Sequence, residues 1–283
     1  MRLMFVAAAA LALSGPALAH PGHAPAKAVA PAMPETLQLP VSNGRKLPVS
    51  VWNGAGKGPV VIFLHGMGGE PAAYRTLFDR WADKGITIVA PTEPDSHSNA
   101  DFAKIDLPTG FGMRTEDMMV TRSYVAQRFA GRKVFLAGHS YGSLFAMMGG
   151  GAVTAAGPLS GPPIAGVVAF SSPGKIPGVV QPTTFAAMKA PVLLFTGTED
   201  VVPGFVPNAT DHRVAFDTAA PGDKMLVTFK GGNHDLVARP GKAFDIAAAL
   251  SARFIDAYAR ADPKAEAAVR AFPSTTDTTV EVR

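Results

Sequence analysis

Residues 135–143, FLAGHSYGS, place a single serine, Ser140, between two glycines at the end of an apolar run. The run at 133–138 is typical of a buried strand, and the apolar residues at 144–148 can face inward on a helix. Between a strand and a helix, Gly-x-Ser-x-Gly forms a strained turn whose small neighbours lift the hydroxyl above the sheet. We therefore predict that Ser140 is a nucleophile rather than the serine of an ordinary tight turn.

Short apolar segments alternate with amphipathic ones on both sides of this turn. Continuous apolar strands that alternate with helices predict a mostly parallel sheet with helices on both faces, and hence one α/β domain. Before it, two alternating runs flank Asn43-Gly44, which favours an antiparallel N-terminal hairpin. The further apolar segments are 59–64, 86–90, 166–170, 191–197 and 225–230.

About twenty residues separate the strands expected at 166–170 and 191–197. This connection is too short for a lid of several helices, so we expect little or no cap domain and an open cleft. Side chains that either line the cleft or only pack the loops together are Met67, Phe102 and Phe111 of the 91–113 stretch, Tyr141, Val201 and Val202.

Residues 1–19 have the layout of a secretory signal peptide, with basic Arg2, an apolar core and small residues before a cleavage point after Ala19. We expect an exported protein, periplasmic or secreted. Cleavage there exposes His20 at the new amino terminus with His23 nearby, a pair that either chelates a transition metal such as copper or simply belongs to a flexible leader.

The remaining boundaries follow from composition. Residues 20–34 are rich in Ala and Pro and lack periodicity, as expected of a flexible leader. The folded domain is predicted to span 35–272, and the polar segment 273–283 to form a loose C-terminal tail.

Composition excludes several classes of protein. Of the 283 residues, 47% are apolar and 17% are charged, as in an ordinary globular domain. The formal charge of +4 is spread along the chain rather than gathered into a stripe, which argues against a nucleic-acid partner. No segment is long and apolar enough to span a bilayer, and the chain has no Cys, so we expect neither integral membrane association nor disulfides.

A serine hydroxyl needs a histidine base and a third group that orients the base. In the fold that typically carries such a strand-to-helix serine turn, the acid and then the histidine follow along the chain. Of the seven histidines, only His212 and His234 follow Ser140. His212, in ATDHRVAF, has the pattern of a capped surface helix, whereas His234, in FKGGNHDL, follows the last apolar run directly. We predict His234 as the base.

The acid is expected after a strand that lies between Ser140 and His234. The segment PVLLFTGTED offers Glu199 and Asp200 after an apolar run and a glycine turn. Asp200 is the predicted acid and Glu199 the runner-up, the alternative being a solvated surface pair.

Attack on an acyl carbon places negative charge on oxygen, which backbone N–H donors stabilise. The segment FLHGMGGE, at 63–70, follows the first strand expected to be parallel, and its glycines allow close approach of the backbone to a ligand. The predicted donors of this oxyanion hole are the amides of Met67 and Tyr141.

On these four motifs the chain, over about residues 36–260, resembles the serine α/β-hydrolase superfamily. FLHGMGGEPAAY, AGHSYGS, LLFTGTEDVVP and GGNHDL are most similar to dienelactone hydrolase, platelet-activating-factor acetylhydrolase and cutinase-like esterases. The resemblance implies ester hydrolysis through an acyl-enzyme, on a small-molecule or polymeric ester, with no cofactor. Dienelactone hydrolases proper use a Cys nucleophile and cutinase-like enzymes often carry disulfides, and this chain has no Cys.

The same machinery serves peptidases and thioesterases, and the same scaffold also serves as a noncatalytic binding module. Such modules usually lack the Ser, the His or the acid, whereas all three have candidates here.

Overall fold

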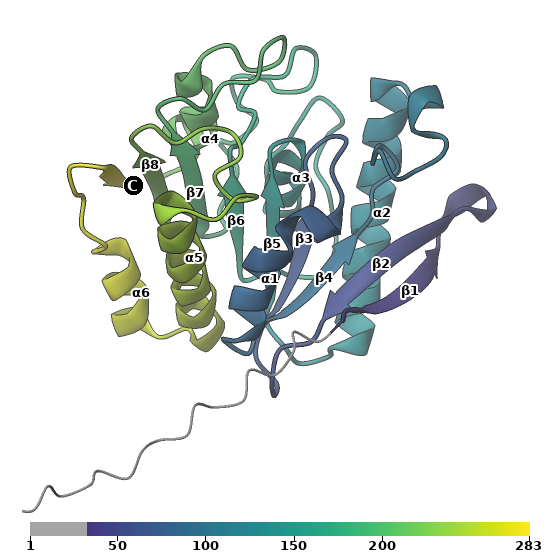
Figure 1. Ribbon diagram of the computed structural model, residues 1–283, viewed down its shortest axis with the longest axis horizontal. Coiled ribbons are helices and arrows are strands. Elements are labelled where there is room, and N and C mark those ends of the chain that lie inside the picture. The colour runs from purple at the N-terminus through teal and green to yellow at the C-terminus, as the bar shows by residue number, and fades with distance from the viewer. Residues whose placement is uncertain (1–32) are drawn as a thin grey trace, which may run out of the picture. The chain divides into compact units, whose positions relative to one another are not determined.

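The computed structural model describes residues 33–283, which form a nine-stranded sheet with helices on both faces (Figure 1). The expected signal peptide and nearly all of the leader, including His20 and His23, lie outside the described residues. The strands are ordered β1-β2-β4-β3-β5-β6-β7-β8-β9 across the sheet. Their bounds are β1 Glu35–Pro40, β2 Lys46–Trp52, β3 Val60–Leu64, β4 Thr87–Pro91, β5 Val134–His139, β6 Gly166–Phe170, β7 Val192–Gly197, β8 Lys224–Phe229 and β9 Thr278–Val282.

The strand pairing confirms the mostly parallel sheet. Strands β4, β3, β5, β6, β7 and β8 pair in parallel, whereas β1 with β2 and β2 with β4 are antiparallel. The predicted hairpin joins β1 to β2, and Asn43 and Gly44 take positive φ angles of 57° and 71°. All the parallel strands end at one edge of the sheet, so the loops that follow them meet there.

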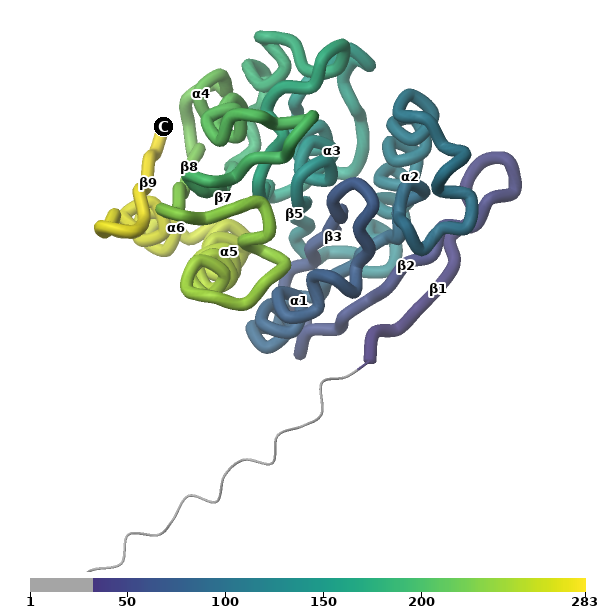
Figure 2. The backbone as a smooth tube through the Cα atoms, turned by 45° about the horizontal axis from the view of Figure 1, so that its top comes forward, coloured from purple at the N-terminus to yellow at the C-terminus, as the bar shows by residue number. Residues whose placement is uncertain are grey.

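Helices cover both faces, as expected from the largely apolar parallel strands (Figure 2). One face packs against α1 (Arg75–Ala82), α5 (Lys242–Arg260) and α6 (Pro263–Arg270), and the other against α2 (Leu107–Arg128), α3 (Tyr141–Gly149) and α4 (Val214–Thr218). Along β5, Phe135 and Ala137 point to the first layer and Leu136 to the second.

The prediction of a loose C-terminal tail was wrong. Strand β9 pairs antiparallel with β8, and Arg213 binds Glu281 of β9 with its Nη1 2.9 Å from Oε1. The final residue, Arg283, also donates its backbone N–H to Lys224. The alternation of TTVEV fits an edge strand, but its polar residues concealed this in the sequence.

The connection between β6 and β7 contains no helix or strand at 171–191, in agreement with the expected absence of a cap domain. Within residues 33–283, no helix is both long and apolar enough to cross a membrane.

Candidate active site

Ser140 occupies the turn between β5 and α3 in a backbone conformation that residues other than glycine rarely adopt, with φ 51° and ψ −124°. The flanking glycines are required by contact. A Cβ at Gly138 would lie 2.5 Å from the backbone of Gly142, and a Cβ at Gly142 would lie 2.1 Å from the carbonyl oxygen of Leu64. The Gly-x-Ser-x-Gly pattern therefore reflects a tightly packed, strained turn at the end of the strand.

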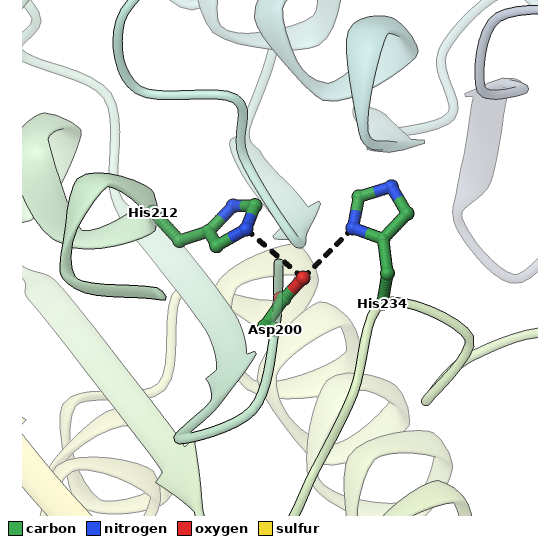
Figure 3. Close-up of side chains that lie close together, drawn as sticks. All are labelled: Asp200, His212 and His234. Atoms are coloured by element: carbon green, nitrogen blue, oxygen red, sulfur yellow. Dashed lines mark hydrogen bonds and ion pairs between the residues drawn. The ribbon is translucent and has the colours of Figure 1, made fainter. Parts of the chain in front are cut away.

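The loops after β7 and β8 bring the predicted acid and base together (Figure 3). His234 Nδ1 lies 2.8 Å from Oδ1 of the fully buried Asp200 carboxylate and donates a hydrogen bond to it. Glycines permit this approach, because a Cβ at Gly197 would lie 2.0 Å from the carbonyl oxygen of Gly232. Glu199, the runner-up, is exposed to solvent.

Hydrogen bonding keeps the Asp200 carboxyl ionised. Burial by itself raises the pKa of this carboxyl, but its contact with His212 and its hydrogen bond from His234 outweigh burial and hold the pKa well below the usual range. Thr196 Oγ1 donates to the other carboxylate oxygen at 2.9 Å.

His212 is not the surface histidine that its sequence context predicts. Its side chain is fully buried in a short 3-10 helix, Ala209–Arg213, and its Nε2 lies 2.9 Å from the same Oδ1 of Asp200 that His234 contacts (Figure 3). This is an ion-pair contact and is not aligned as a hydrogen bond. Its Nδ1 donates to the Ser172 carbonyl. No local feature of ATDHRVAF signals this position, because it depends on packing between distant segments.

Ser140, His234 and both predicted oxyanion donors line one open cavity of about 1160 Å³. Within the described part of the chain, the backbone N–H groups of Met67 and Tyr141 have no acceptor. Ser140 Oγ likewise makes no hydrogen bond to His234 there, as is common before substrate binds.

All but one of the side chains expected to line the cleft do line this cavity. The expected side chains that line it are Met67, Phe102, Phe111, Tyr141 and Val202, whereas Val201 is not part of the lining. Phe111 also packs against Phe145, with ring centroids 5.0 Å apart, so it both lines the cleft and holds the surrounding loops.

Solved structures of other proteins share this architecture. No family model and no curated protein matches the chain. Solved structures do match, among them the esterase domain of a Rhodothermus marinus protein, with a TM-score of 0.55 at 14% identity over 79% of this chain and 98% of that one. Thermogutta terrifontis esterase 2 matches with a TM-score of 0.60 at 16% identity over 81% and 96%. Dienelactone hydrolase from Anabaena variabilis matches with a TM-score of 0.61 at 18% identity over 79% and 98%. The chain has the α/β-hydrolase fold.

Within this α/β-hydrolase fold, a buried arginine that the sequence did not predict lies beside the site. Arg114 of α2 donates to the carbonyls of His65 and Gly66 at 2.9 and 3.3 Å, and its Nε pairs with Asp95 at 2.8 Å. Its guanidinium also lies over the Tyr141 ring, 5.1 Å from the centroid. Arg114 thus fixes the loop after β3 against the start of α3, the two segments that carry the predicted oxyanion donors.

A second buried network links this loop to the histidine loop. The Gly66 N–H donates to the Tyr74 hydroxyl at 3.1 Å, and that hydroxyl lies 2.9 Å from His139 Nδ1. His139 Nε2 donates to the carbonyl of His234 at 2.8 Å. Burial, and next the adjacent His234 ring, lower the pKa of His139 to about 3, so His139 is neutral and carries its proton on Nε2.

Asp200, His212 and His234 each offer one ligand atom, and these atoms lie within 4.8 Å of one another. Two imidazoles and a carboxylate are also a common ligand set for divalent transition metals. Here, however, both imidazoles face a single carboxylate oxygen, and a bound ion would have to replace the proton that joins His234 to Asp200. Both imidazoles therefore already engage the carboxylate oxygen that a metal would need.

Proposed function

We propose that this protein is an exported serine hydrolase that cleaves carboxylic esters through an acyl-enzyme intermediate. One observation carries the proposal: three features meet at one cavity. They are the strained Ser140, His234 hydrogen-bonded to the buried Asp200, and two backbone N–H groups that have no acceptor among the described residues. They come from the loops after different parallel strands, so the fold itself assembles them.

Ser140 Oγ attacks the ester carbonyl carbon while His234 Nε2 accepts the hydroxyl proton. Asp200 keeps the other ring proton on Nδ1, so Nε2 is the free base that faces the cavity. The same proton then passes to the leaving alcohol as the tetrahedral intermediate collapses to the acyl-enzyme. Water, activated in turn by His234, attacks the acyl carbon and releases the acid and free Ser140.

The amides of Met67 and Tyr141 stabilise the oxyanion of each tetrahedral intermediate. Tyr141 is the first residue of α3, so its N–H also carries the partial positive charge of a helix amino terminus. Removal of one such donor typically costs on the order of 3 kcal/mol of transition-state stabilisation.

The cavity favours a bulky, uncharged, apolar ester. Leu107 and Phe205 line the cavity and are 58% and 62% exposed, respectively. They extend its apolar surface from the cleft to solvent. Of its charged residues, Lys175 is paired with Asp211 at 2.6 Å and Asp235 with Arg239 at 3.0 Å. Neither residue is therefore a free counter-ion for a charged substrate.

A neighbouring structure has reacted with reagents of one chemical class. Thermogutta terrifontis esterase 2 is described as phosphoramylated by tabun and as phosphorylated by paraoxon. We expect the same class of organophosphorus reagent to modify Ser140 here, because the strained turn presents its hydroxyl at the cavity.

A panel of p-nitrophenyl esters of rising chain length, with matched p-nitroanilides and thioesters, tests the proposal on the purified mature chain. We expect ester turnover that rises with acyl length and is lost in Ser140→Ala. Equal turnover by wild type and Ser140→Ala, or none by either, contradicts the proposal, and the second result favours a noncatalytic binding module. Cleavage of anilides or thioesters without esters favours a peptidase or thioesterase.

Export is tested separately. We expect the chain in the periplasm or culture medium with His20 as its first residue, as measured by fractionation and intact mass. Retention of the full-length chain in the cytoplasm contradicts export and leaves the chemical proposal standing.

A further inference from the structure

We propose that His212 is a doubly protonated partner of the triad carboxylate, a positioning residue that compensates the charge of Asp200 and holds its Oδ1 toward His234. The inference rests on the proposed function, since it assigns a role within that site. It concerns a histidine that never reaches the substrate cavity.

The contacts of the His212 ring determine its protonation. Nδ1 faces the carbonyl oxygen of Ser172, which can only accept a hydrogen bond. Nε2 faces the carboxylate oxygen of Asp200 at 2.9 Å, which is also only an acceptor. A neutral imidazole has a single N–H, so either tautomer would direct a lone pair at one of these oxygens. The imidazolium alone offers a proton to both.

Burial makes this requirement strict. The side chains of both His212 and Asp200 are fully buried, so water cannot take the place of a missing proton. A buried carboxylate paired only with the neutral His234 would carry an uncompensated charge, which is costly in a protein interior. With His212 protonated, the pair is neutral overall.

The anion in contact with His212 also favours the imidazolium. Asp200 is the anion in direct contact with His212, and the rings of His234 and His139 face the same region, that of His234 with its centroid 5.7 Å away. The adjacent Asp211 is paired with Lys175. Burial lowers the pKa of His212, but its contacts with Asp200 and Ser172 outweigh burial, and the pKa lies above its ordinary value.

The segment that carries His212 is held tightly against the loop after β6. Gly174, with φ 63°, approaches the short helix so closely that a Cβ there would lie 1.7 Å from the Asp211 carbonyl oxygen. Lys175 Nζ also donates to the Asp211 carboxylate. The position of the imidazolium is therefore set by backbone packing as well as by its own contacts.

The proposal has a kinetic signature. When His212 loses its proton at alkaline pH, its Nε2 lone pair faces the Asp200 carboxylate, and the attraction becomes a repulsion. Asp200 then loses its fixed position relative to His234 Nδ1. We therefore expect kcat to fall on the alkaline side of the pH profile, and this fall to depend on His212.

Two amide variants separate the contacts of His212. His212→Gln places an uncharged N–H near the position of Nε2 and keeps a donor toward Asp200, whereas His212→Asn keeps a donor toward Ser172 only. We expect kcat to fall about tenfold in His212→Gln and about a hundredfold in His212→Asn, with KM within about twofold of wild type. Both variants should lose the alkaline fall.

A wild-type kcat in both variants overturns the proposal, and so does a lowered kcat whose alkaline fall is unchanged. Nitrogen-15 NMR of the histidine rings in the wild-type mature chain tests the protonation state without any assay of activity, with His212→Gln used to assign the signals. We expect both nitrogens of His212 to be protonated at pH 6, and one to lose its proton in Asp200→Asn.

An unprotonated nitrogen on His212 at pH 6 in wild type refutes the charge pair. A protonated His212 in a chain that hydrolyses no ester supports the charge pair and contradicts the proposed function, so the two failures are distinguishable.

Discussion

His234 and His212 contact the same oxygen of Asp200 and yet have opposite surroundings. The side chain of His234 is 22% exposed and lines the cavity, whereas that of His212 is fully buried. The difference lies in the second ring nitrogen, which in His212 is committed to the Ser172 carbonyl and in His234 has no hydrogen-bond partner among the described residues. The two imidazoles thus differ in the partner of the ring nitrogen that does not face Asp200.

The largest expected effect comes from removing His234, the histidine of this pair that we propose as the base. His234→Ala and Ser140→Ala should each lower kcat by about 10⁴- to 10⁶-fold, and the double variant should lose little more, because base and nucleophile act as one unit. Ester hydrolysis assays on folded variants, checked by circular dichroism, measure this. Additive losses, or a loss below about tenfold in His234→Ala, would assign the base elsewhere.

Asp200→Asn removes the oxygen that both histidines share. We expect kcat to fall about 10⁴-fold, since His234 loses the acceptor that fixes its tautomer, and the free energy of unfolding to fall by about 3–5 kcal/mol, since His212 is left without its counter-ion. Steady-state kinetics and urea unfolding at pH 7 test this. Unchanged stability would mean that His212 is already neutral in the wild type.

Glu93 shows how a buried carboxyl behaves when burial outweighs the nearby cations Arg114 and Arg45. Its Oε2 has no hydrogen-bond partner in the described part of the chain, and burial raises the pKa of Glu93 from 4.5 to about 8. A raised carboxyl pKa makes the fold favour the protonated form, so its cost to stability grows as pH rises from the unfolded value of about 4.5 toward the folded one.

Replacing Glu93 by Gln removes this titration. Between pH 5 and pH 8, the free energy of unfolding of wild type should fall by about 3–4 kcal/mol more than that of Glu93→Gln, as urea melts across this range will show. Parallel pH profiles for the two proteins would mean that Glu93 titrates normally.

The smallest expected effect concerns the stability given by the charge pair itself. His212 has a raised pKa, so its contribution is fully present below its unfolded value near 6.5 and is lost as pH rises through the folded value. Asp200 has a lowered pKa, so its contribution is present above its unfolded value near 3.8 and is lost as pH falls through the folded value.

Between these limits, at about pH 5 to 6.5, wild type should exceed His212→Gln in free energy of unfolding by about 1–2 kcal/mol. The gap should narrow as pH rises further. A gap that widens with pH would contradict a protonated His212.

Much of this arrangement follows from the sequence. The turn at Ser140, the β1–β2 hairpin and the choice of Asp200 over Glu199 depend on local signals, namely glycines at fixed positions and the ends of apolar runs. Parallel strands then bring the loops to one edge of the sheet, which is why linear order sufficed to predict that His234 and Asp200 meet.

The features that the sequence did not predict depend on contacts between distant segments. His212 and Arg114 are polar residues in helical segments, where a solvated position is the ordinary expectation, and both are buried. Likewise, β9 has polar residues that resemble a tail and forms a strand only because β8 offers it an edge. Such positions are set by packing, for which the local pattern gives no signal.

Covalent labelling of the mature protein with a fluorophosphonate tests the central claim most directly, because it reports the activated nucleophile without assuming any substrate. Intact and peptide mass spectrometry should find one phosphonyl group per chain, on Ser140, with no adduct in Ser140→Ala and much slower labelling in His234→Ala. An unmodified wild-type chain, or an adduct on any other residue, would contradict the account.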